Sequence, residues 1–571
     1  MAAISGFYSF NEQADLCTKL RKDSKLTFVE GQNFAVGYAS QYARLIQSDS
    51  LGAVLQVSVS GEEGVWDLQV KLREGGFTLS RDIFGRISLY WLRTANAICF
   101  STHLKSLLQF VDSLSISTEA FHAYSSFSFV PAPLSAISGI NSIEPGCSLR
   151  WGEHNSEPEF VRDSNWLLNQ NVNSSLSEAE AIDGLVHELD EAIKAQVCDL
   201  RDRSVAVFLS GGLDSAITAA ALTRVGVKIE AYSLDFGPYG ISELPYAQEV
   251  AQHLKIPLKI VSALPRDIER NFHSSIEALD GNYGDGVTVP LYLLNKAAAA
   301  DGHTLAFNGE GGDQLFGGWT NKPLIASSVY GEVHRDDDSF LSTYMRTFHR
   351  LNGHERLVFS DELYSKIVDD DLGKYLAEAL SRREDAPLIN VLRRANLLLK
   401  GAQNIQPRAS NLAMYQGLNL RSLFCHKPLA DWTFSIPPEL MLRGACEKYI
   451  LKKAVESWLP ESIVFREKRG MGVPLSDWCT GPMWGHLGKY FNSAALARSG
   501  YWQTDIAARL VFSEVSAQLT GRRIGETLWL MLMWEAWLDL VNGAERTTSR
   551  YNLFWPPLTL LKLFRKEVYQ V

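Results

Sequence analysis

The chain has 571 residues, too many for one ordinary domain, so two or three domains are expected. Its formal charge of -10, from 55 basic and 65 acidic residues, argues against a nucleic-acid partner, whose phosphates favour a basic face. Its 7 cysteines are scattered without a C-x-x-C pair, which argues against a disulfide framework or a zinc site and favours a reducing, cytoplasmic location.

Residues 1–165 are expected to form a β-rich domain. Strand-like runs at 52–61, 66–75 and 97–102 are separated by glycine and charged turns. The opening segment MAAISGFYSF lacks the basic region and long apolar core of a secretory signal, so none is expected.

A second domain is expected over residues 175–545. Ser177 and Glu180 form a capping-box pattern that predicts an amphipathic helix over 181–197. Strands and helices then alternate: a strand at 205–209, a helix from Ala216, a strand at 228–236, a helix at 246–255, and strands at 257–263 and 304–308. This alternation predicts an α/β fold with a parallel, doubly wound sheet whose ligands bind at the carboxyl ends of its strands.

Beyond about residue 340 the pattern is mainly helical. The apolar stretch 524–541 is interrupted by Glu526, Glu535 and Asp539, so it predicts a buried helix and no membrane span. Residues 546–571 form a C-terminal extension. One helical face of this extension carries Leu558, Leu561, Phe564 and Val568, which favours docking on the chain's own surface over a partner or membrane site.

The stretch SGGLDS at 210–215 lies where a strand leads directly into a helix. Backbone N–H groups of such a turn and of the helix N-terminus can bind an anion. The chain has no G-x-x-x-x-G-K-[ST] loop, and Phe208 replaces the first glycine of a nucleophile elbow. On this stretch alone, an ordinary glycine-rich turn remains the alternative.

Three motifs taken together resemble the asparagine synthetase family of ATP pyrophosphatases. They are SGGLDS, NGEGGDQLFGGW at 308–319 and FREKRGMGVPLSDW at 465–478. In the first domain, RDIFGRISLYW at 81–91 and the segment 129–151 resemble the family's glutaminase-type domain. The resemblance implies an N-terminal Ntn-type α+β domain, an ATP pyrophosphatase domain with added C-terminal helices, and ATP and Mg²⁺ as cofactors.

The resemblance also implies a reaction. A substrate carboxylate attacks the α-phosphorus of ATP to give an acyl-adenylate and pyrophosphate, and an amine then attacks the acyl carbon. Asp214 and Asp313 are expected to bind Mg²⁺, with helix capping as the alternative role. The residues expected to contact the nucleotide are Ser210, Gly211, Gly212 and Ser215 at the pyrophosphate and Leu209, Ser233, Leu234 and Gly309 around the adenosine.

Two residues are expected to act in the chemistry. Glu310 is a reasonable general base for the attacking ammonium. Lys468 matches a lysine that stabilises charge at the reacting centre, although a solvated surface lysine is the alternative. By the same resemblance, Arg469 is expected at the pyrophosphate, and Asp285 and Arg408 in the substrate pocket.

The sequence departs from the family in two places. Glutamine-using members begin Met-Cys-Gly-Ile, and the cysteine thiol attacks glutamine; here the aligned residues are Met1-Ala2-Ala3-Ile4. Cys17 cannot replace that thiol because it has no free α-amine, so the first domain is expected to keep its fold without its reaction. Leu423 and His426 stand where relatives commonly have Pro and Asp, which argues against aspartate as the substrate.

The favoured function is therefore an AMP-forming amide ligase whose amine comes from a source other than glutamine. Lasso peptide cyclases, which join a peptide's N-terminal amine to an Asp or Glu side chain, are the favoured subtype. β-Lactam synthetases fit less well, because they carry tyrosine where Glu310 stands. The expected substrate is a peptide or small molecule with both carboxylate and amine, and precursor-peptide-processing proteins are the expected partners. The alternatives are an asparagine synthetase that uses free ammonia and a non-catalytic binding protein.

Overall fold

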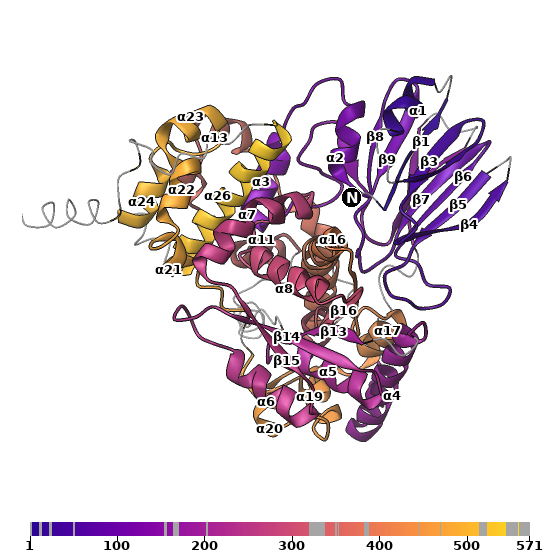
Figure 1. Ribbon diagram of the computed structural model, residues 1–571, viewed down its shortest axis with the longest axis vertical. Helices are drawn as coiled ribbons and strands as arrows, with labels where there is room; N and C mark the ends of the chain where they lie inside the picture. Colours follow the sequence, from indigo (N-terminus) through magenta and orange to yellow (C-terminus); the bar gives the residue numbers. More distant parts are fainter. Residues whose placement is uncertain are drawn as a thin grey trace, which may run out of the picture.

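The structure is a computed structural model of the chain. It describes residues 3–10, 14–21, 26–49, 52–152, 157–163, 171–200, 204–318, 337–348, 351, 353–381, 387–444, 446–468, 470–512, 522–543, 555 and 558. Figure 1 shows a β-rich N-terminal domain beside a larger domain in which helices surround a separate sheet.

The N-terminal domain is a sandwich of two antiparallel sheets, each six-stranded in the described residues. The first sheet has the order β10 (Ile140–Ser142), β8 (Tyr90–Arg93), β9 (Ala97–Ser101), β1 (Ile4–Ser9), β3 (Phe34–Tyr38), β2 (Thr27–Glu30). The second has the order β12 (Glu159–Arg162), β11 (Cys147–Gly152), β7 (Gly76–Arg81), β6 (Leu68–Arg73), β5 (Gly52–Val57), β4 (Ala43–Asp49).

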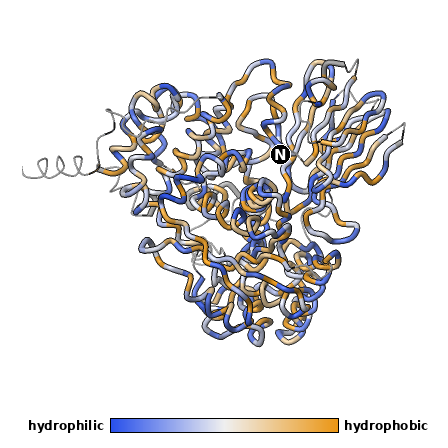
Figure 2. Tube along the Cα trace, in the orientation of Figure 1, coloured by the Kyte–Doolittle hydropathy of each residue, from blue (hydrophilic) through white to orange (hydrophobic). Residues whose placement is uncertain are grey.

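The two sheets of this domain face each other across an apolar core. Buried and partly exposed residues alternate along β5, as the two-residue period of a half-buried strand requires. Strands of both sheets contribute to the core, with Ile4 and Phe100 from one and Leu55, Val70 and Leu79 from the other. Figure 2 shows hydrophobic and hydrophilic residues interspersed along the chain of this domain. The outer face of the first sheet is covered by α1 (Ala14–Leu20) and α2 (Leu104–Leu107).

The larger domain is built on a parallel sheet with the order β15 (Leu258–Ser262), β14 (Ile229–Asp235), β13 (Val205–Phe208), β16 (Leu305–Asn308), β17 (Asn419–Ser422). One face packs against α5 (Leu213–Arg224) and α6 (Leu244–Leu254), with α4 (Glu178–Val197) outside α5. The other face packs against α8 (Thr288–Ala300) and α16 (Gln406–Tyr415), which contact α7 (Pro265–Leu279). The sheet is therefore doubly wound, and its strand order reverses between β13 and β16, where ligands of such sheets bind.

One sequence prediction for this domain was wrong in its bounds, and the mainly helical pattern predicted beyond residue 340 was confirmed but left out a strand. Helix α5 begins at Leu213, not at Ala216, because Gly212 serves as its N-cap; Asp214 and Ser215 therefore lie in the first turn of the helix. The chain beyond residue 340 is not wholly helical, because Asn419–Ser422 forms the fifth strand of the sheet. That strand reads NLRS and lacks the apolar run typical of a central strand.

Helices complete the larger domain. The described ones after β16 are α9 (Gly312–Phe316), α11 (Asp337–Phe348), α12 (Glu355–Val358), α13 (Asp361–Ile367), α14 (Lys374–Leu380), α15 (Leu388–Ala395), the π-helix η2 (Asn396–Ile405), α17 (Lys427–Ser435), α18 (Pro438–Met441), α19 (Tyr449–Ala454), α20 (Glu461–Val464), α21 (Leu475–Cys479), α22 (Trp484–Phe491), α23 (Ser493–Ser499), α24 (Ile506–Phe512) and α26 (Arg522–Val541). A short hairpin of β18 (Leu442–Arg443) and β19 (Cys446–Glu447) precedes α19.

Helix α26 is the buried apolar helix that the sequence predicts, with Trp529, Trp534 and Trp537 among its buried side chains. Among the described residues, no helix has the length and apolar character needed to cross a membrane. Of the C-terminal extension, only Trp555 and Leu558 are described. The Trp555 ring stacks on Trp484 at a centroid distance of 4.4 Å. The expected positions of Leu561, Phe564 and Val568 lie outside the described residues, as does the N-terminal Ala2.

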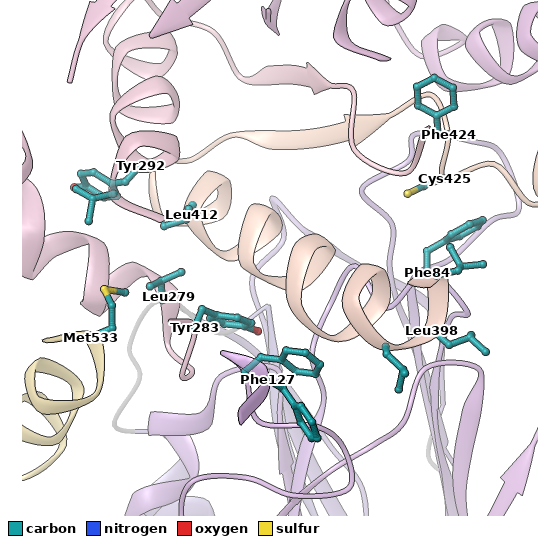
Figure 3. Packing of buried hydrophobic residues seen from close by; sticks show 14 of the residues in the cluster. Phe84, Phe127, Leu279, Tyr283, Tyr292, Leu398, Leu412, Phe424, Cys425 and Met533 are labelled. Carbon is teal, nitrogen blue, oxygen red and sulfur yellow. The ribbon is translucent and has the colours of Figure 1, made fainter. Parts of the chain in front are cut away.

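The two domains share one apolar core. Figure 3 shows Phe84 and Phe127 of the first domain in the same cluster as Tyr283, Leu398 and Leu412 of the second. Buried guanidinium groups join the domains as well. Arg421 on β17 donates through Nε to the Val59 carbonyl at 3.1 Å, and Arg81 donates through Nη2 to the Ala402 carbonyl at 3.1 Å.

The turns that follow β13 and β16 pack directly against each other. Gly309 follows β16, and a Cβ atom at this position would overlap the Ser215 amide nitrogen and lie 2.7 Å from the Asp214 carbonyl carbon. Thr218 of α5 reinforces this contact by donating to the Asn308 carbonyl at 3.3 Å. Only glycine at 309 lets the backbone of the second turn approach the N-terminus of α5 so closely.

A buried carboxyl group lies inside the helical part of the domain. Glu535 of α26 is 6% exposed, and Trp502 donates through Nε1 to its Oε1 at 2.8 Å. Burial raises the pKa of Glu535 from 4.5 to about 8, although hydrogen bonds from Ser499 and Trp502 oppose the shift. The side chain is therefore protonated in the folded chain at neutral pH.

We predict that Gly309→Ala destabilises the chain, because the new Cβ must push the turn away from α5. Overpacking of this kind costs about 1–3 kcal/mol, which thermal unfolding followed by circular dichroism would detect. Gly485→Ala is the matched control: a Cβ there meets nothing within 4 Å, so it should leave stability equal or slightly higher. Equal melting temperatures for Gly309→Ala and wild type would contradict this account of the turn contact.

We also predict that the stability of the chain falls between about pH 4.5 and 8 in a way that depends on Glu535. Its folded pKa exceeds its unfolded pKa, so its contribution is fully present below 4.5 and declines as pH rises to about 8. Each pKa unit by which the folded and unfolded states differ corresponds to about 1.4 kcal/mol of folding free energy. Glu535→Gln keeps an acceptor for Trp502 and cannot ionise, so its melting temperature should exceed wild type by several degrees at pH 9 and match it more closely at pH 6. Parallel melting curves of the two proteins across this range would count against the prediction.

Candidate active site

The turn after β13 is held in shape by its own hydroxyl groups. The Ser210 and Ser215 Oγ atoms lie 3.1 Å apart, the Gly212 amide donates to Ser210 Oγ at 3.2 Å, and the Ser210 amide donates to Ser215 Oγ at 3.2 Å. Gly211 has a positive φ of 75° and lies against α6, where a Cβ would come within 2.7 Å of the Ala247 nitrogen. The turn thus leads into α5 with a fixed geometry, and the first amides of the helix can bind an anion.

Two lysines and two aspartates form a compact ionic cluster beside this turn. The Lys448 ammonium lies 2.6 Å from both Asp214 carboxylate oxygens and 2.6 Å from Asp313 Oδ1. Lys468 Nζ lies 2.7 Å from Asp313 Oδ2. Lys448 joins β19 to α19 with a positive φ of 56°, an uncommon conformation for a residue with a side chain. The cluster therefore connects the turns after β13 and β16 with the C-terminal helices.

The charged groups of this cluster change one another's pKa values. Burial raises the pKa of Asp214 above its usual value, with Lys448 opposing. Burial alone would also raise the pKa of Asp313, but Lys448 and Lys468 outweigh it and hold that pKa well below its usual range. For Lys468, burial favours the neutral amine, but the nearby carboxylates of Asp313 and Asp214 prevail and raise its pKa. Lys468 is therefore a fixed cation at this end of the site.

The residues of the two turns suit a magnesium ion that is shared with phosphate oxygens. Mg²⁺ is typically bound by one or two protein carboxylates together with the phosphates of a nucleotide. Asp214 and Asp313 provide two carboxylates, and Lys448 already bridges them with a positive charge. Among the described residues, no group of three or more His, Cys, Asp or Glu side chains forms a metal site by itself. The donor set thus fits a nucleotide-bound ion better than a resident metal.

Glu310 lies in the second turn, close to this cluster. Its amide donates to Asn308 Oδ1 at 3.2 Å, and Ser422 of β17 donates to its carbonyl oxygen. Burial raises the pKa of the Glu310 carboxyl; Arg408 opposes the shift and Asp313 adds to it. A carboxyl group with a raised pKa is better suited to accept a proton near neutral pH than an ordinary glutamate.

Arg408 and Asp285 form a buried pair next to Glu310. Arg408 Nη1 donates to Asp285 Oδ2 at 2.8 Å, and Asn404 Nδ2 donates to the same oxygen at 2.7 Å. The other carboxylate oxygen accepts a hydrogen bond of 3.0 Å from Ser128, which belongs to the N-terminal domain. Asn404 lies on the π-helix η2, a wide helical turn of the kind frequent at functional sites. Both domains therefore build this part of the site.

One cavity of about 1070 Å³ contains these groups. The predicted site residues that line it are Leu209, Ser210, Gly212, Asp214, Ser215, Ser233, Leu234, Asp285, Gly309, Glu310, Asp313, Arg408 and Lys468. Gly211 does not line the cavity and packs against α6 instead, so its predicted contact with pyrophosphate is disfavoured. Arg469 lies outside the described residues.

The structure adds residues that the sequence analysis missed. Lys448, Arg466 and Ser128 all line the cavity. Arg466 stacks on Tyr246 at 3.6 Å from the ring centroid and donates to the Gly211 carbonyl at 3.3 Å. The charged run REKR could have indicated Arg466, two residues before Lys468. Ser128 and Lys448 carry no comparable signal, because each reaches the site only through the folding of distant segments.

His426 and Leu423, the two departures from the family pattern, lie away from the cavity lining. His426 Nδ1 lies 3.0 Å from Glu62 Oε2 of the N-terminal domain, and both side chains are buried. Leu423 is fully buried in the shared core. The His426–Glu62 pair therefore joins the two domains, and Leu423 packs in the core that they share.

Comparisons with known proteins follow the same two-part organisation. A family model described as asparagine synthase matches residues 184–539, and one described as a glutamine amidotransferase domain matches residues 58–161. The glutamine-hydrolyzing asparagine synthetase 1 of Bacillus subtilis (strain 168) is 27% identical over 431 residues. This match covers 71% of the present chain and 66% of the Bacillus protein, just under two thirds of its length.

Other relatives differ in name and in extent of similarity. Amidase chry2 of Gibberella zeae is 21% identical over 74% of this chain and 72% of its own length. The glutamine-hydrolyzing asparagine synthetase B of Escherichia coli (strain K12) is 24% identical over 49% of this chain and 42% of its own length. A solved structure, NMN synthetase from Francisella tularensis, is 19% identical with a TM-score of 0.18 over 25% of this chain and 58% of its own, too slight a likeness to carry an argument. Because the asparagine synthase model covers more than half of the sequence, the chain belongs to the asparagine synthase family.

Proposed function

We propose that the protein is an AMP-forming amide ligase that couples a substrate carboxylate to an amine from a source other than glutamine, with macrolactam closure of a peptide as the favoured reaction. One observation carries the proposal: the Asp214–Lys448–Asp313–Lys468 cluster and Glu310 share a single cavity. Charge stabilisation for a phosphate group and a proton acceptor for an amine are thus available a short distance apart.

In the first step, a carboxylate oxygen of the substrate attacks the α-phosphorus of ATP. The bond to the bridging oxygen breaks, and pyrophosphate leaves with the electron pair. The Ser210–Ser215 turn and the N-terminus of α5 would bind the departing phosphates, and Lys468 would stabilise their negative charge. Asp214 and Asp313 would hold Mg²⁺, which when bound neutralises charge on the phosphates.

In the second step, an amine nitrogen attacks the acyl carbon of the adenylate, and AMP leaves with its phosphate oxygen. The attacking nitrogen must lose a proton for a neutral amide to form. Glu310 is the group we assign to accept it, because burial raises the pKa of this carboxyl and its side chain lies in the cavity. Asp285 and Arg408 would position the substrate beside it.

The chemistry of the N-terminal cysteines supports an amine source other than glutamine. Attack on a glutamine carboxamide requires a thiolate. Burial raises the pKa of both Cys99 and Cys147 to about 12, and it raises the pKa of Cys17 as well. Ala2 stands where glutamine-using relatives carry their cysteine. We therefore propose that the first domain has a structural role, in contrast to relatives whose names state glutamine hydrolysis.

A tethered amine has a physical advantage over free ammonia. When one substrate carries both carboxylate and amine, the second step becomes intramolecular, which can contribute about 7–11 kcal/mol if the groups are well oriented. A peptide of this kind would come from precursor-processing partner proteins.

All 7 cysteines are free thiols in the structure, which supports a reducing compartment such as the cytoplasm.

We predict that Asp214→Asn lowers ATP-dependent AMP formation by about 10²-fold or more, because a carboxylate at the phosphates is lost. Asp183→Asn, on an exposed position of α4, is the matched control and should keep wild-type turnover. AMP release would be measured by chromatography with the same substrate mixture for each protein. Near-normal AMP release by Asp214→Asn would remove this residue from the reaction.

We further predict that glutamine does not supply the amide nitrogen. The chain would be incubated with ATP, Mg²⁺, ¹⁵N-amide glutamine and a panel of carboxylic acids, which includes aspartate and Asp-containing peptides with a free N-terminus. The expected outcome is no glutamate release and no label in any amide product, with AMP formed only when one substrate carries both groups. A second arm with ammonium chloride and aspartate tests the alternative: asparagine formed there would identify a synthetase that uses free ammonia.

A further inference from the structure

The cavity that contains the Asp285–Arg408 pair is also lined by a group of apolar side chains. We call the part that they line the apolar chamber and define it by Phe127, Tyr344, Phe348, Leu392 and Leu530, all of which line the cavity. They come from widely separated parts of the sequence: α3 (Thr118–Phe127) of the N-terminal domain, α11, α15 and α26. The adenylation and amide-forming steps proposed above use none of these residues.

Aromatic rings form one wall of the chamber. The Phe127 and Phe348 ring centroids are 5.4 Å apart at an interplanar angle of 40°, and those of Tyr344 and Phe348 are 5.3 Å apart at 31°. Tyr344 and Phe348 lie one turn apart on α11 and so share a helix face. Phe348 is only partly buried, whereas Phe127 is 4% exposed. Phe348 therefore offers ring surface that a bound molecule can still cover.

The chamber lies directly beside the groups that we assign to the substrate. Ser128, which follows Phe127, donates to Asp285 at 3.0 Å. Leu530 packs against the segment just before Asp285, because a Cβ atom at Gly284 would meet the Leu530 side chain. Tyr124, also on α3, fixes Leu530 by donating to its carbonyl at 2.8 Å. A molecule that reaches the Asp285–Arg408 pair therefore has the apolar chamber next to it.

We propose that the carboxylate donor carries a bulky apolar or aromatic group close to its reacting carboxyl, and that this group packs in the apolar chamber. The inference rests on the proposed function and specifies its substrate class. A small polar acid such as aspartate would leave the partly exposed ring of Phe348 facing water. An aromatic group on the substrate would instead pack against the chamber in a tilted arrangement and bury its apolar surface there. Burial of apolar surface is the main source of affinity in apolar pockets.

Two probes that differ only by a phenyl group test this inference: N-phenylacetyl-L-aspartate and N-acetyl-L-aspartate. Binding to the full chain would be measured by calorimetry in the presence of Mg²⁺ and α,β-methylene ATP, which cannot transfer its adenylyl group because a methylene replaces the bridging oxygen that must leave. We expect the phenyl-bearing probe to bind at least about 10-fold more tightly. Phe348→Ala, and the milder Phe348→Leu, should reduce that ratio while the Kd of the nucleotide analogue stays unchanged.

Phe160→Ala is the matched control, because Phe160 is 50% exposed on β12 and does not line the cavity. It should leave the ratio of the two probes as in wild type. Equal affinity of wild type for both probes, including failure of both to bind, would overturn the inference, as would an unchanged ratio in both Phe348 variants. Neither result would contradict the proposed reaction. That proposal is tested separately, and it fails if Asp214→Asn retains normal AMP formation.

Discussion

The Lys448 ammonium, placed between Asp214 and Asp313, is the interaction on which the geometry of the site depends. Two buried carboxylates this close together repel each other and have lost their hydration. Both effects are unfavourable unless an opposing charge compensates them. Lys448 supplies that charge from a different part of the chain, at the junction of β19 and α19. It therefore fixes the turn after β13, the turn after β16 and the C-terminal helices relative to one another. A nucleotide that binds at these turns meets a charge pattern that is already in place, so little reorganisation is needed.

The N-terminal domain takes part in the same site. Ser128 holds one oxygen of Asp285, and Phe127 lines the cavity beside it. Arg81, Arg421 and the His426–Glu62 pair join the domains away from the cavity. A domain that matches the glutamine amidotransferase model therefore forms part of the wall of the cavity in the neighbouring domain.

Local sequence patterns predicted much of the fold, and the family resemblance indicated most of the predicted residues that line the cavity. The alternation of strands and helices after Val205 predicted the doubly wound sheet, and the glycine-rich turns predicted where its polar residues gather. Patterns failed where the structure depends on distant contacts. Strand β17 is stabilised by its pairing with β16 and not by an apolar run of its own. Lys448 lies in a charged stretch typical of a solvated helix start, and only the folded chain shows that its ammonium is buried.

The core shared by the two domains has a consequence for how the molecule can move. A hinge between domains would be the simplest route for admitting a large substrate. Here Phe129 and Tyr283 form an antiparallel β-bridge between the domains, and the Gly284 amide donates to the Ser128 carbonyl at 2.8 Å. Opening a hinge would break this bridge and expose the apolar cluster to which Phe127 and Tyr283 belong. We therefore expect the two domains to move as one rigid unit, so that a substrate enters the cavity without their separation.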